Sequence, residues 1–398
     1  GMVYGDIDQS RGCHLPRGDV LALVNQYPEY SDLYRNAFIH SRVKAYKEHG
    51  TNVDVVKIGP RFNKGFYEFN GVDVTTGEDY SELHTMIANG NYKAILVHFL
   101  NKQGWGVLKE YAAKIPVIVW IHGFEIQPYH RREYNFRNDE ERERAIRASN
   151  DRSAFWRDLF KSKNENVHFV FVSQYFADEV MKDLEVKLDS WQYSIIHNFV
   201  DTAVFEYIPR VESDRLKLLS IRSFASPKYA NDLTVKALLE LSARPFFKEL
   251  SIKIVGDGVL FDQTVEPLKK FPNVALEKGF LSVSEYQKIF KEYGVFITPT
   301  RWDSQGVSRD EAMASGLVAI SNRIAGVPEF VDDTCGILVD PEDYIGIANS
   351  IERLYKEPDW YLQLSSAAAA RVRRQNGLNN TILRELMLIS ELLGGRQA

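Results

Sequence analysis

The sequence is poor in cysteine, with two in 398 residues, Cys13 and Cys335, far apart in the chain. A disulfide framework needs more, so we expect a buried core to stabilise this protein in a reducing, cytoplasmic compartment. Long apolar runs are also missing, because stretches such as residues 116–120 have the length of a strand and not of a membrane-spanning helix. No signal peptide is visible.

An excess of positive charge is missing as well. The chain has 49 Lys and Arg against 54 Asp and Glu, a formal net charge of −5. Proteins that bind nucleic acid are usually basic, so we expect no nucleic acid partner. The sequence shows no zinc-type cluster, no Asp-x-Asp metal motif, no Walker loop and no nucleophile elbow, and we name no metal ligand.

What is present is the composition of a globular protein, 44% hydrophobic and 26% charged, in a chain long enough for two domains. Strand-like and helix-like segments alternate in both halves, without a repeat of fixed period. This alternation predicts α/β domains built on parallel, doubly wound sheets. In the first half the clearest predicted strands are residues 19–24, 53–58, 94–100, 117–122 and 167–172.

The most informative stretch is residues 298–331. A strand-like run leads into a polar loop and then a helix predicted over 309–315, and a helix N-terminus favours phosphate through its free N–H groups and its dipole. Asp303 and Glu311 bracket the loop, and a carboxylate can accept hydrogen bonds from two vicinal sugar hydroxyls. Ser308 to Glu311 equally fits a capping box, in which Glu311 would bind only the backbone N–H of Ser308. The residues alone leave both interpretations open.

This stretch resembles the signature of retaining glycosyltransferase family 4, whose members have the GT-B fold. The resemblance rests on two acids with seven residues between them, Asp303 and Glu311, followed by Ala-Met-Ala-Ser-Gly at 312–316 and Gly-Val-Pro-Glu at 326–329. It implies two Rossmann-like, doubly wound domains facing a central cleft, with a C-terminal helix that crosses back to the first domain. The expected parts are an acceptor-side domain at 1–208, a donor-side domain at 209–375 and the helix at 376–398.

The resemblance also implies a set of site residues. Glu311 would bind the ribose hydroxyls, Asp303 would bind hydroxyls of the transferred sugar, and His122, at the end of a first-half strand, would face that sugar. Arg222 and Lys228 would clamp the diphosphate, whose charge grows as it leaves. The remaining candidates would contact the nucleotide, largely through backbone groups: Gly256, Gly258, Phe280, Leu281, Gly306, Val307 and Ser308.

Purely structural roles stay open for several of these residues. A pair such as Gly256 and Gly258 is equally typical of a tight turn, and a lone histidine such as His122 is often structural. Residues 124–163 are rich in Arg and Glu with interleaved aromatic residues. Because the two charges nearly balance there, a solvated helix is favoured over a membrane-surface or acceptor-binding segment.

The function implied by the resemblance is the transfer of a hexosyl or N-acetylhexosaminyl group from a UDP- or GDP-sugar to a hydroxyl of a glycan or lipid-linked glycan, with retention of configuration and without metal or organic cofactor. The setting would be polysaccharide, cell-surface glycan or glycolipid biosynthesis, with peripheral membrane contact at the cytoplasmic face. Two alternatives remain open, a sugar-nucleotide 2-epimerase-like enzyme of the same fold and a non-catalytic, glycosyltransferase-like binding subunit.

Overall fold

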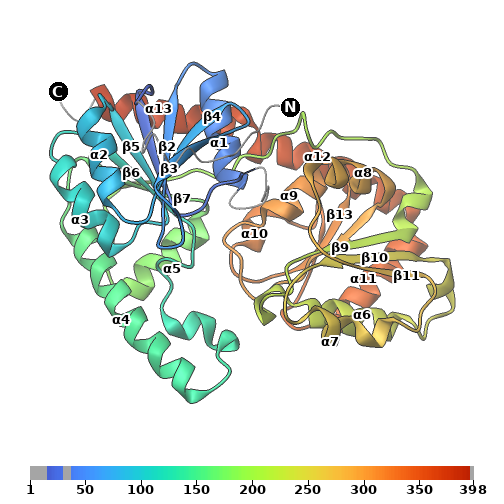
Figure 1. Cartoon of the computed structure of the whole chain (residues 1–398). Helices are drawn as coiled ribbons and strands as arrows, with labels where there is room; N and C mark the ends of the chain where they lie inside the picture. The colour runs from blue at the N-terminus through green and yellow to red at the C-terminus, as the bar shows by residue number, and fades with distance from the viewer. Residues whose placement is uncertain (1–15, 30–36, 395–398) are drawn as a thin grey trace. The chain divides into compact units, whose positions relative to one another are not determined.

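The computed structural model describes residues 16–29 and 37–394, and the chain divides into two compact units (Figure 1). The first unit extends to Arg131, resumes over Asn138–Phe199 and is completed by the chain from Leu378 onward. The second unit consists of Arg132–Arg137 and Val200–Gly377. The chain thus enters the second unit at Val200 and not at residue 209, because Val200 and Phe205 are buried in the core of that unit.

The first unit is built on one eight-stranded sheet covered by helices. Its strands are β1 (Val20–Val24), β2 (Val53–Ile58), β3 (Gly65–Phe69), β4 (Val72–Gly77), β5 (Ala94–His98), β6 (Val117–Ile121), β7 (Val167–Phe171) and β8 (Tyr193–Ile195). Its helices are α1 (Ala37–Glu48), α2 (Ser81–Asn89), α3 (Lys102–Tyr111), α4 (Asp139–Lys161), α5 (Gln174–Leu184) and α13 (Ile382–Gly394).

The strand order of this sheet is β3-β4-β2-β1-β5-β6-β7-β8. β3 and β4 pair antiparallel as an edge hairpin, and the other neighbours pair in parallel. The central strands β1, β5, β6 and β7 are buried along their whole length. Their nearly continuous apolar sequences follow from this, because helices cover both faces of a parallel sheet.

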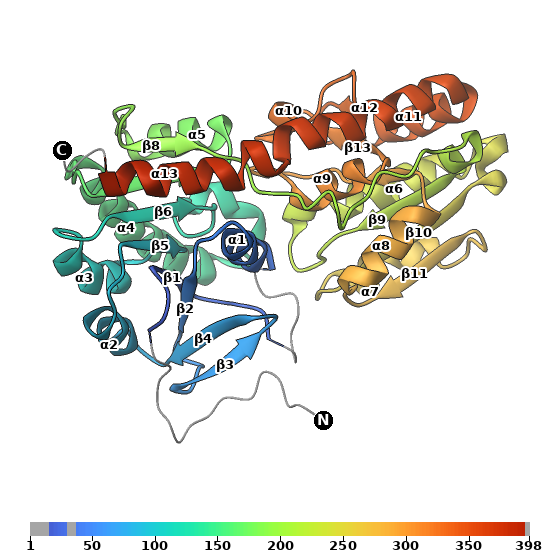
Figure 2. The ribbon, with the colours of Figure 1, turned by 90° about the horizontal axis from the view of Figure 1, so that it is seen from above.

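The C-terminal helix α13 packs on the first unit, which confirms that the chain crosses back to it (Figure 2). Its apolar residues join the first core, and Glu385, only 1% exposed, is buried with them. Arg42 Nε lies 3.0 Å from a carboxylate oxygen of Glu385, Tyr46 donates to it at 3.0 Å and Trp120 at 3.1 Å. A buried carboxylate is tolerated when its oxygens are satisfied in this way.

The second unit contains a six-stranded parallel sheet in the order β11-β10-β9-β12-β13-β14. Its strands are β9 (Lys217–Ile221), β10 (Ser251–Gly256), β11 (Val274–Lys278), β12 (Val295–Ile297), β13 (Val318–Asn322) and β14 (Ile337–Val339). Its helices are α6 (Asn231–Leu241), α7 (Phe261–Val265), α8 (Val283–Glu292), α9 (Val307–Ala314), α10 (Val327–Phe330), α11 (Tyr344–Lys356) and α12 (Pro358–Asn376). The expected organisation in two doubly wound α/β domains is therefore confirmed.

The Arg- and Glu-rich segment forms the long helix α4, most of whose residues are exposed or half-buried. Its charges include an i,i+4 pair between Arg144 and Glu140 at 4.0 Å, and its buried side chains gather in its second half around Trp156. This is the solvated helix that the balanced charges favoured. Of the helices in the described ranges, none combines the length and the apolar character that a membrane crossing would require.

Candidate functional site

The candidate site of the second unit lies where the strand order of its sheet reverses. β9 and β12 are neighbours, and the chain proceeds outward from β9 to β10 and β11 on one side and from β12 to β13 and β14 on the other. Open α/β sheets bind ligands at the carboxyl ends of the strands at such a reversal. Arg222 directly follows β9, and the loop after β12 carries Asp303.

Arg222 is a buried cation with unused hydrogen-bonding capacity. Its Nη1 donates to Thr298 Oγ1 at 2.8 Å, while its Nε is buried and has no partner among the described residues. Burial lowers the pKa of this guanidinium, and the nearby charge of Asp303 opposes that shift. Because an arginine stays charged in proteins, this arrangement leaves a positive charge available for an anion.

Lys228 lies close to Arg222, and the ring of Tyr229 lies beside both cations. Cζ of Arg222 is 5.3 Å from the centroid of this ring, and Nζ of Lys228 is 4.8 Å from it. The negative face of an aromatic ring attracts cations, so Tyr229 offsets part of the repulsion between the two charges. The structure therefore brings together the two cations that the resemblance singled out.

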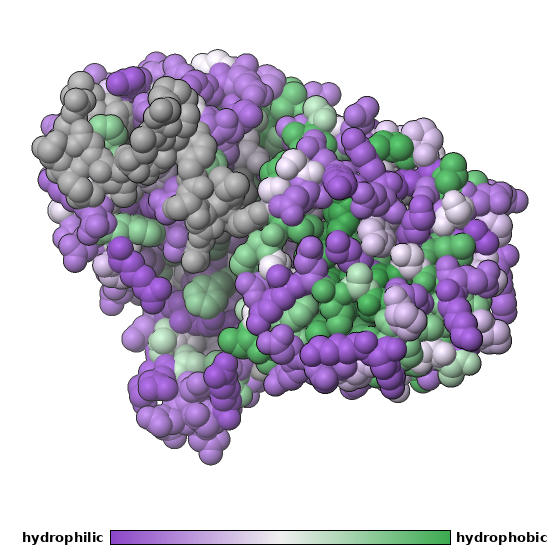
Figure 3. All heavy atoms as spheres, turned by 45° about the vertical axis from the view of Figure 1, so that its right-hand side comes forward, coloured by the Kyte–Doolittle hydropathy of each residue, from purple (hydrophilic) through white to green (hydrophobic). Residues whose placement is uncertain are grey.

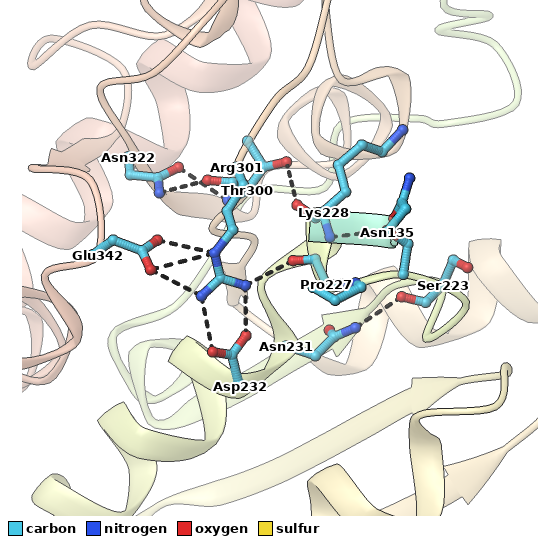
Figure 4. A network of polar contacts seen from close by, with 11 residues as sticks. Asn135, Ser223, Pro227, Lys228, Asn231, Asp232, Thr300, Arg301, Asn322 and Glu342 are labelled. Carbon is cyan, nitrogen blue, oxygen red and sulfur yellow. Dashed lines mark hydrogen bonds and ion pairs between the residues drawn. The ribbon is translucent and has the colours of Figure 1, made fainter. Parts of the chain in front are cut away.

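Arg301, which sequence reasoning missed, holds the loop that carries Lys228 (Figure 4). Its guanidinium forms a bidentate pair with Asp232 at 2.9 Å, contacts Glu342 at 3.0 Å and donates to the carbonyl of Pro227 at 2.7 Å. Its backbone N–H donates to the carbonyl of Lys228 at 2.8 Å. The ammonium of Lys228 extends away from these contacts (Figure 4). No motif marks Arg301, because its partners are scattered along the chain.

The backbone around Asp303 is held by the Gly-Val-Pro-Glu segment. Gly326 donates its N–H to the carbonyl of Asp303 at 2.9 Å. A Cβ atom at position 326 would lie 2.4 Å from the carbonyl oxygen of Ser304, so only glycine permits this approach. The carboxylate of Asp303 accepts the backbone N–H of Gln305 at 3.3 Å.

Helix α9 begins at Val307, earlier than predicted, with Gly306 as its N-cap at φ 101°. Ser308 therefore lies inside the helix, its hydroxyl is buried without a partner among the described residues, and no side chain caps the N-terminus. The capping-box interpretation is wrong, because the left-handed conformation of Gly306 starts the helix before Ser308. The N-terminus that precedes Glu311 is thus free of a side-chain cap.

Two buried charges at the start of α9 stabilise the loop from within. Gln305 Nε2 donates to Asp310 at 2.9 Å, and Arg309 pairs with Asp310 at 3.3 Å. Arg309 also donates to the carbonyl of Gln305. These contacts link the loop to the first turn of the helix and hold its backbone in place.

Glu311 is half-buried, and no described residue hydrogen-bonds its carboxylate. Burial, together with the charge of Asp310, raises the pKa of Glu311 to about 8. A carboxylate that loses water without gaining donors is costly for the folded state. Such a group is suited to a ligand that brings hydroxyl donors.

This cost predicts a stability effect of replacing Glu311. Between the ordinary pKa of 4.5 and the folded value of about 8, the native state binds more protons than the unfolded state, so Glu311 lowers stability as the pH rises through that window. Glu311→Gln should therefore raise Tm at pH 9 by roughly 2–4 °C and change it little near pH 4. Glu285→Gln is the matched control, because backbone donation from Ser282 lowers the pKa of Glu285. An equal rise in both variants would contradict the assignment to burial.

The remaining candidates of the second unit differ in their surroundings. A Cβ at Gly256 would lie 2.1 Å from the carbonyl oxygen of Arg222, and one at Gly258 would lie 2.3 Å from the carbonyl carbon of Phe224. Both glycines thus allow close packing against the loop that carries Arg222.

The two candidates for contact with the base differ in burial. Leu281 is buried in the core, whereas Phe280 is 63% exposed. Figure 3 shows hydrophobic residues reaching the surface among hydrophilic ones.

His122 belongs to the first unit, where it directly follows β6. Its Nε2 lies 2.9 Å from Nδ1 of His98, the last residue of β5. Sequence reasoning singled out His122 and missed His98. The available signal was that each histidine lies near the carboxyl end of a predicted strand, 94–100 and 117–122, and that these two strands follow one another in the chain.

Comparison with known proteins places the candidate site of the second unit in a recognised family region. Residues 215–357, about a third of the chain, match the family model of Glycosyl transferases group 1. Sucrose synthase of Acidithiobacillus caldus is 31% identical over 114 residues, 27% of this chain and 14% of that protein. An uncharacterized 41.2 kDa protein in the cps region of Klebsiella pneumoniae is 30% identical over 135 residues, 33% of this chain and 35% of that protein. The chain thus matches only a minor part of the length of these relatives.

Solved structures resemble the whole chain. Sucrose-phosphate synthase from Thermosynechococcus elongatus has a TM-score of 0.71 at 15% identity, covering 94% of this chain and 99% of that one. A glycosyltransferase from Rickettsia africae has a TM-score of 0.68 at 12% identity, covering 95% and 99%. Anabaena HepE, in complex with UDP and glucose, has a TM-score of 0.66 at 14% identity, covering 95% and 100%. The chain therefore has the GT-B fold of these proteins, and its residues 215–357 match Glycosyl transferases group 1.

Proposed function

We propose that this protein is a retaining, metal-independent glycosyltransferase that moves a hexosyl or N-acetylhexosaminyl group from a nucleotide sugar to a hydroxyl of a glycan or lipid-linked glycan. The observation that carries the proposal is the convergence of Arg222 and Lys228 beside Tyr229, at the carboxyl end of β9. Neither cation forms an ion pair with a carboxylate of the described residues, and two such cations suit a diphosphate. The match to Glycosyl transferases group 1 supports it.

The chemistry requires charge stabilisation more than a protein nucleophile. The bond between the anomeric carbon and the phosphate oxygen breaks, the acceptor oxygen bonds to that carbon, and the acceptor proton passes to the leaving phosphate. Arg222 and Lys228 would stabilise the charge that grows on the leaving diphosphate. Glu311 would accept the ribose hydroxyls and Asp303 those of the transferred sugar. Gly306, Val307 and Ser308 would offer the N-terminus of α9 to phosphate.

The donor nucleotide is expected to be a uridine or guanosine diphosphate. The complex of Anabaena HepE with UDP and glucose favours testing UDP first. Synthesis of polysaccharides, cell-surface glycans or glycolipids at the cytoplasmic face of a membrane is the setting we propose.

A thermal-shift screen of UDP-, GDP- and ADP-sugars tests the donor directly. A ligand that binds only the folded protein stabilises it by about 2.7 kcal/mol at a concentration of 100 Kd, so the correct donor should raise Tm measurably. The Arg222→Ala variant should lose most of this rise. If no nucleotide sugar raises Tm, the proposed function is wrong. If a nucleotide sugar does raise Tm, transfer or hydrolysis of that donor by the purified chain distinguishes an enzyme from a binding subunit.

Activity should survive removal of divalent metal ions. In the proposed site the diphosphate charge is met by Arg222, Lys228 and the N-terminus of α9, so no metal ion is needed to neutralise it. Excess EDTA should change turnover by less than about twofold. A complete loss in EDTA that Mg²⁺ or Mn²⁺ restores would contradict this assignment.

A further inference from the structure

A pair of hydrogen-bonded histidines lies in the first unit at the carboxyl ends of two adjacent parallel strands. His98 ends β5 and His122 follows β6. His98 Nδ1 is 2.9 Å from His122 Nε2. The ring planes differ by 17° and the centroids are 5.2 Å apart, so the two rings lie nearly edge to edge with the contact in their common plane. This geometry suits a nearly straight N–H···N hydrogen bond.

Both imidazoles are neutral in this environment. His98 is 3% exposed, and His122 is half-buried between the rings of Phe38, at 5.1 Å, and Phe99, at 4.7 Å. Burial and the charge of Arg42 lower the pKa of both histidines. Two neutral rings that share one hydrogen bond have two possible proton arrangements, and each gives His122 Nδ1 a different role.

The surroundings of His98 decide between the two arrangements. Neither His98 Nε2 nor His122 Nδ1 has a described hydrogen-bond partner, so each arrangement leaves one ring N–H unpaired. That N–H is costlier on His98, which is 3% exposed, than on His122, which is half-buried. An unsatisfied buried donor is costly, which places the proton of His98 on Nδ1, the atom that faces His122. We infer that His98 is a positioning residue: its Nδ1–H donates to His122 Nε2 and thereby makes His122 Nδ1 a hydrogen-bond donor.

The ring of His98 is held by its strand neighbour. His98 and Trp120 are register partners on β5 and β6, and their rings stack with centroids 4.9 Å apart and planes 18° apart. The indole N–H of Trp120 donates in turn to Glu385 of the C-terminal helix. The stack fixes the plane of the His98 ring, and a half-turn within that plane would replace Nδ1 by a carbon and lose the hydrogen bond to His122.

His122 Nδ1 has no hydrogen-bond partner among the described residues. As a neutral donor it would bind an oxygen lone pair, such as that of a sugar hydroxyl, and would contribute no positive charge. The sugar as ligand rests on the proposed function, whereas the proton arrangement of the two histidines rests on the first unit alone.

Nitrogen-15 NMR of the ligand-free protein tests the proton arrangement. Two-bond ¹H–¹⁵N correlations distinguish the protonated from the unprotonated ring nitrogen, and the His122→Asn spectrum identifies the signals of His122. Wild type should show His122 protonated on Nδ1. Protonation of His122 on Nε2 in wild type would overturn the inference, and this measurement requires no substitution at His98 and no substrate.

Variants at position 98 test the dependence on His98. His98→Phe keeps a ring against Trp120 but removes the donor, so His122 should change toward the Nε2 form. Turnover of UDP-glucose should then fall about threefold to tenfold, the scale of one hydrogen bond. His98→Asn, whose amide N–H can replace Nδ1–H, should stay near wild type. His168→Phe is the matched control for loss of a buried histidine in the same sheet.

An unchanged tautomer of His122 in His98→Phe would overturn the positioning role. If the tautomers behave as expected but no nucleotide sugar is consumed, the proposed function fails and the role of His98 stands. The two conclusions are therefore tested separately.

Discussion

Arg222→Ala and Lys228→Ala should each lower turnover of the sugar nucleotide by roughly 10²-fold or more, the scale for losing a preorganised group that stabilises transition-state charge. The two side chains flank Tyr229, with Cζ of Arg222 at 5.3 Å and Nζ of Lys228 at 4.8 Å from the ring centroid. Removing either one takes away one of the two side-chain charges of the proposed clamp and leaves the other cation and the N-terminus of α9 to stabilise the leaving diphosphate.

The second unit offers matched controls for these variants. Lys236 and Arg353 also lie over aromatic rings, with Nζ of Lys236 5.9 Å from Tyr344 and Cζ of Arg353 3.7 Å from Trp360. Lys236→Ala and Arg353→Ala each remove a charge and an aromatic contact, but on helices α6 and α11 and not in the loop that follows β9. Turnover in these controls should stay within about twofold. Steady-state kinetics of the variants decide the matter. Wild-type turnover in both Arg222→Ala and Lys228→Ala would contradict the proposal that these two residues bind the diphosphate.

Glu311→Gln should weaken binding of the nucleoside diphosphate by about 1.5–3 kcal/mol, which is roughly tenfold to a hundredfold in Kd. The carboxylate is half-buried, and no described residue donates to it. If it accepts the ribose hydroxyls, replacing one oxygen with an amide NH₂ removes an acceptor and introduces a donor that faces a donor. The fold should remain intact, since Gln is nearly isosteric with Glu.

Asp303→Asn should act on a different part of the ligand. Its carboxylate is proposed to bind hydroxyls of the transferred sugar, so the substitution should lower turnover and leave the affinity for the free nucleoside diphosphate nearly unchanged. The backbone of Asp303 accepts from Gly326 at 2.9 Å, and this contact does not depend on the side chain. The variant therefore isolates the carboxylate.

Calorimetry with nucleoside diphosphate and with nucleotide sugar, on both variants, separates the two roles. Equal losses for the two ligands in Asp303→Asn would mean that this residue binds the diphosphate part or changes the whole loop. An unchanged Kd for both ligands in Glu311→Gln would mean that Glu311 does not contact the ligand. Because the titration is performed without turnover, neither result depends on the acceptor.

The sequence by itself determined the features that follow from local pattern. The alternation of apolar strands with amphipathic helices predicted two doubly wound units, because the spacing of apolar residues along the sequence differs between strands and helices. Ser173 is of a residue type typical of helix N-caps, and its hydroxyl accepts from the N–H of Phe176 at 3.2 Å at the start of α5. Such signals act within a few residues of one another.

The sequence also located Asp303 and Glu311, and it placed Arg222 and Lys228 beside the first strand of the second half. It left the capping box open, and the structure excludes it. Ser308 to Glu311 has the composition of a capping box, but Gly306 adopts a left-handed conformation as the N-cap of α9, which begins at Val307, one residue before Ser308. The close approach of Gly326 holds the preceding loop in place from a segment beyond β13. A pattern of neighbouring residues cannot predict this contact, because Gly326 and Asp303 lie far apart in the chain.

Only the tertiary structure decided which residues support the sites. Arg301 holds the backbone of Lys228 through partners on α6 and beyond β14, and His98 meets His122 only because β5 and β6 are neighbours in the sheet. These contacts join residues far apart in the chain, and each residue type is common on its own. Their chemistry comes from burial and from partner geometry, which exist only after the strands have paired and the helices have packed on them.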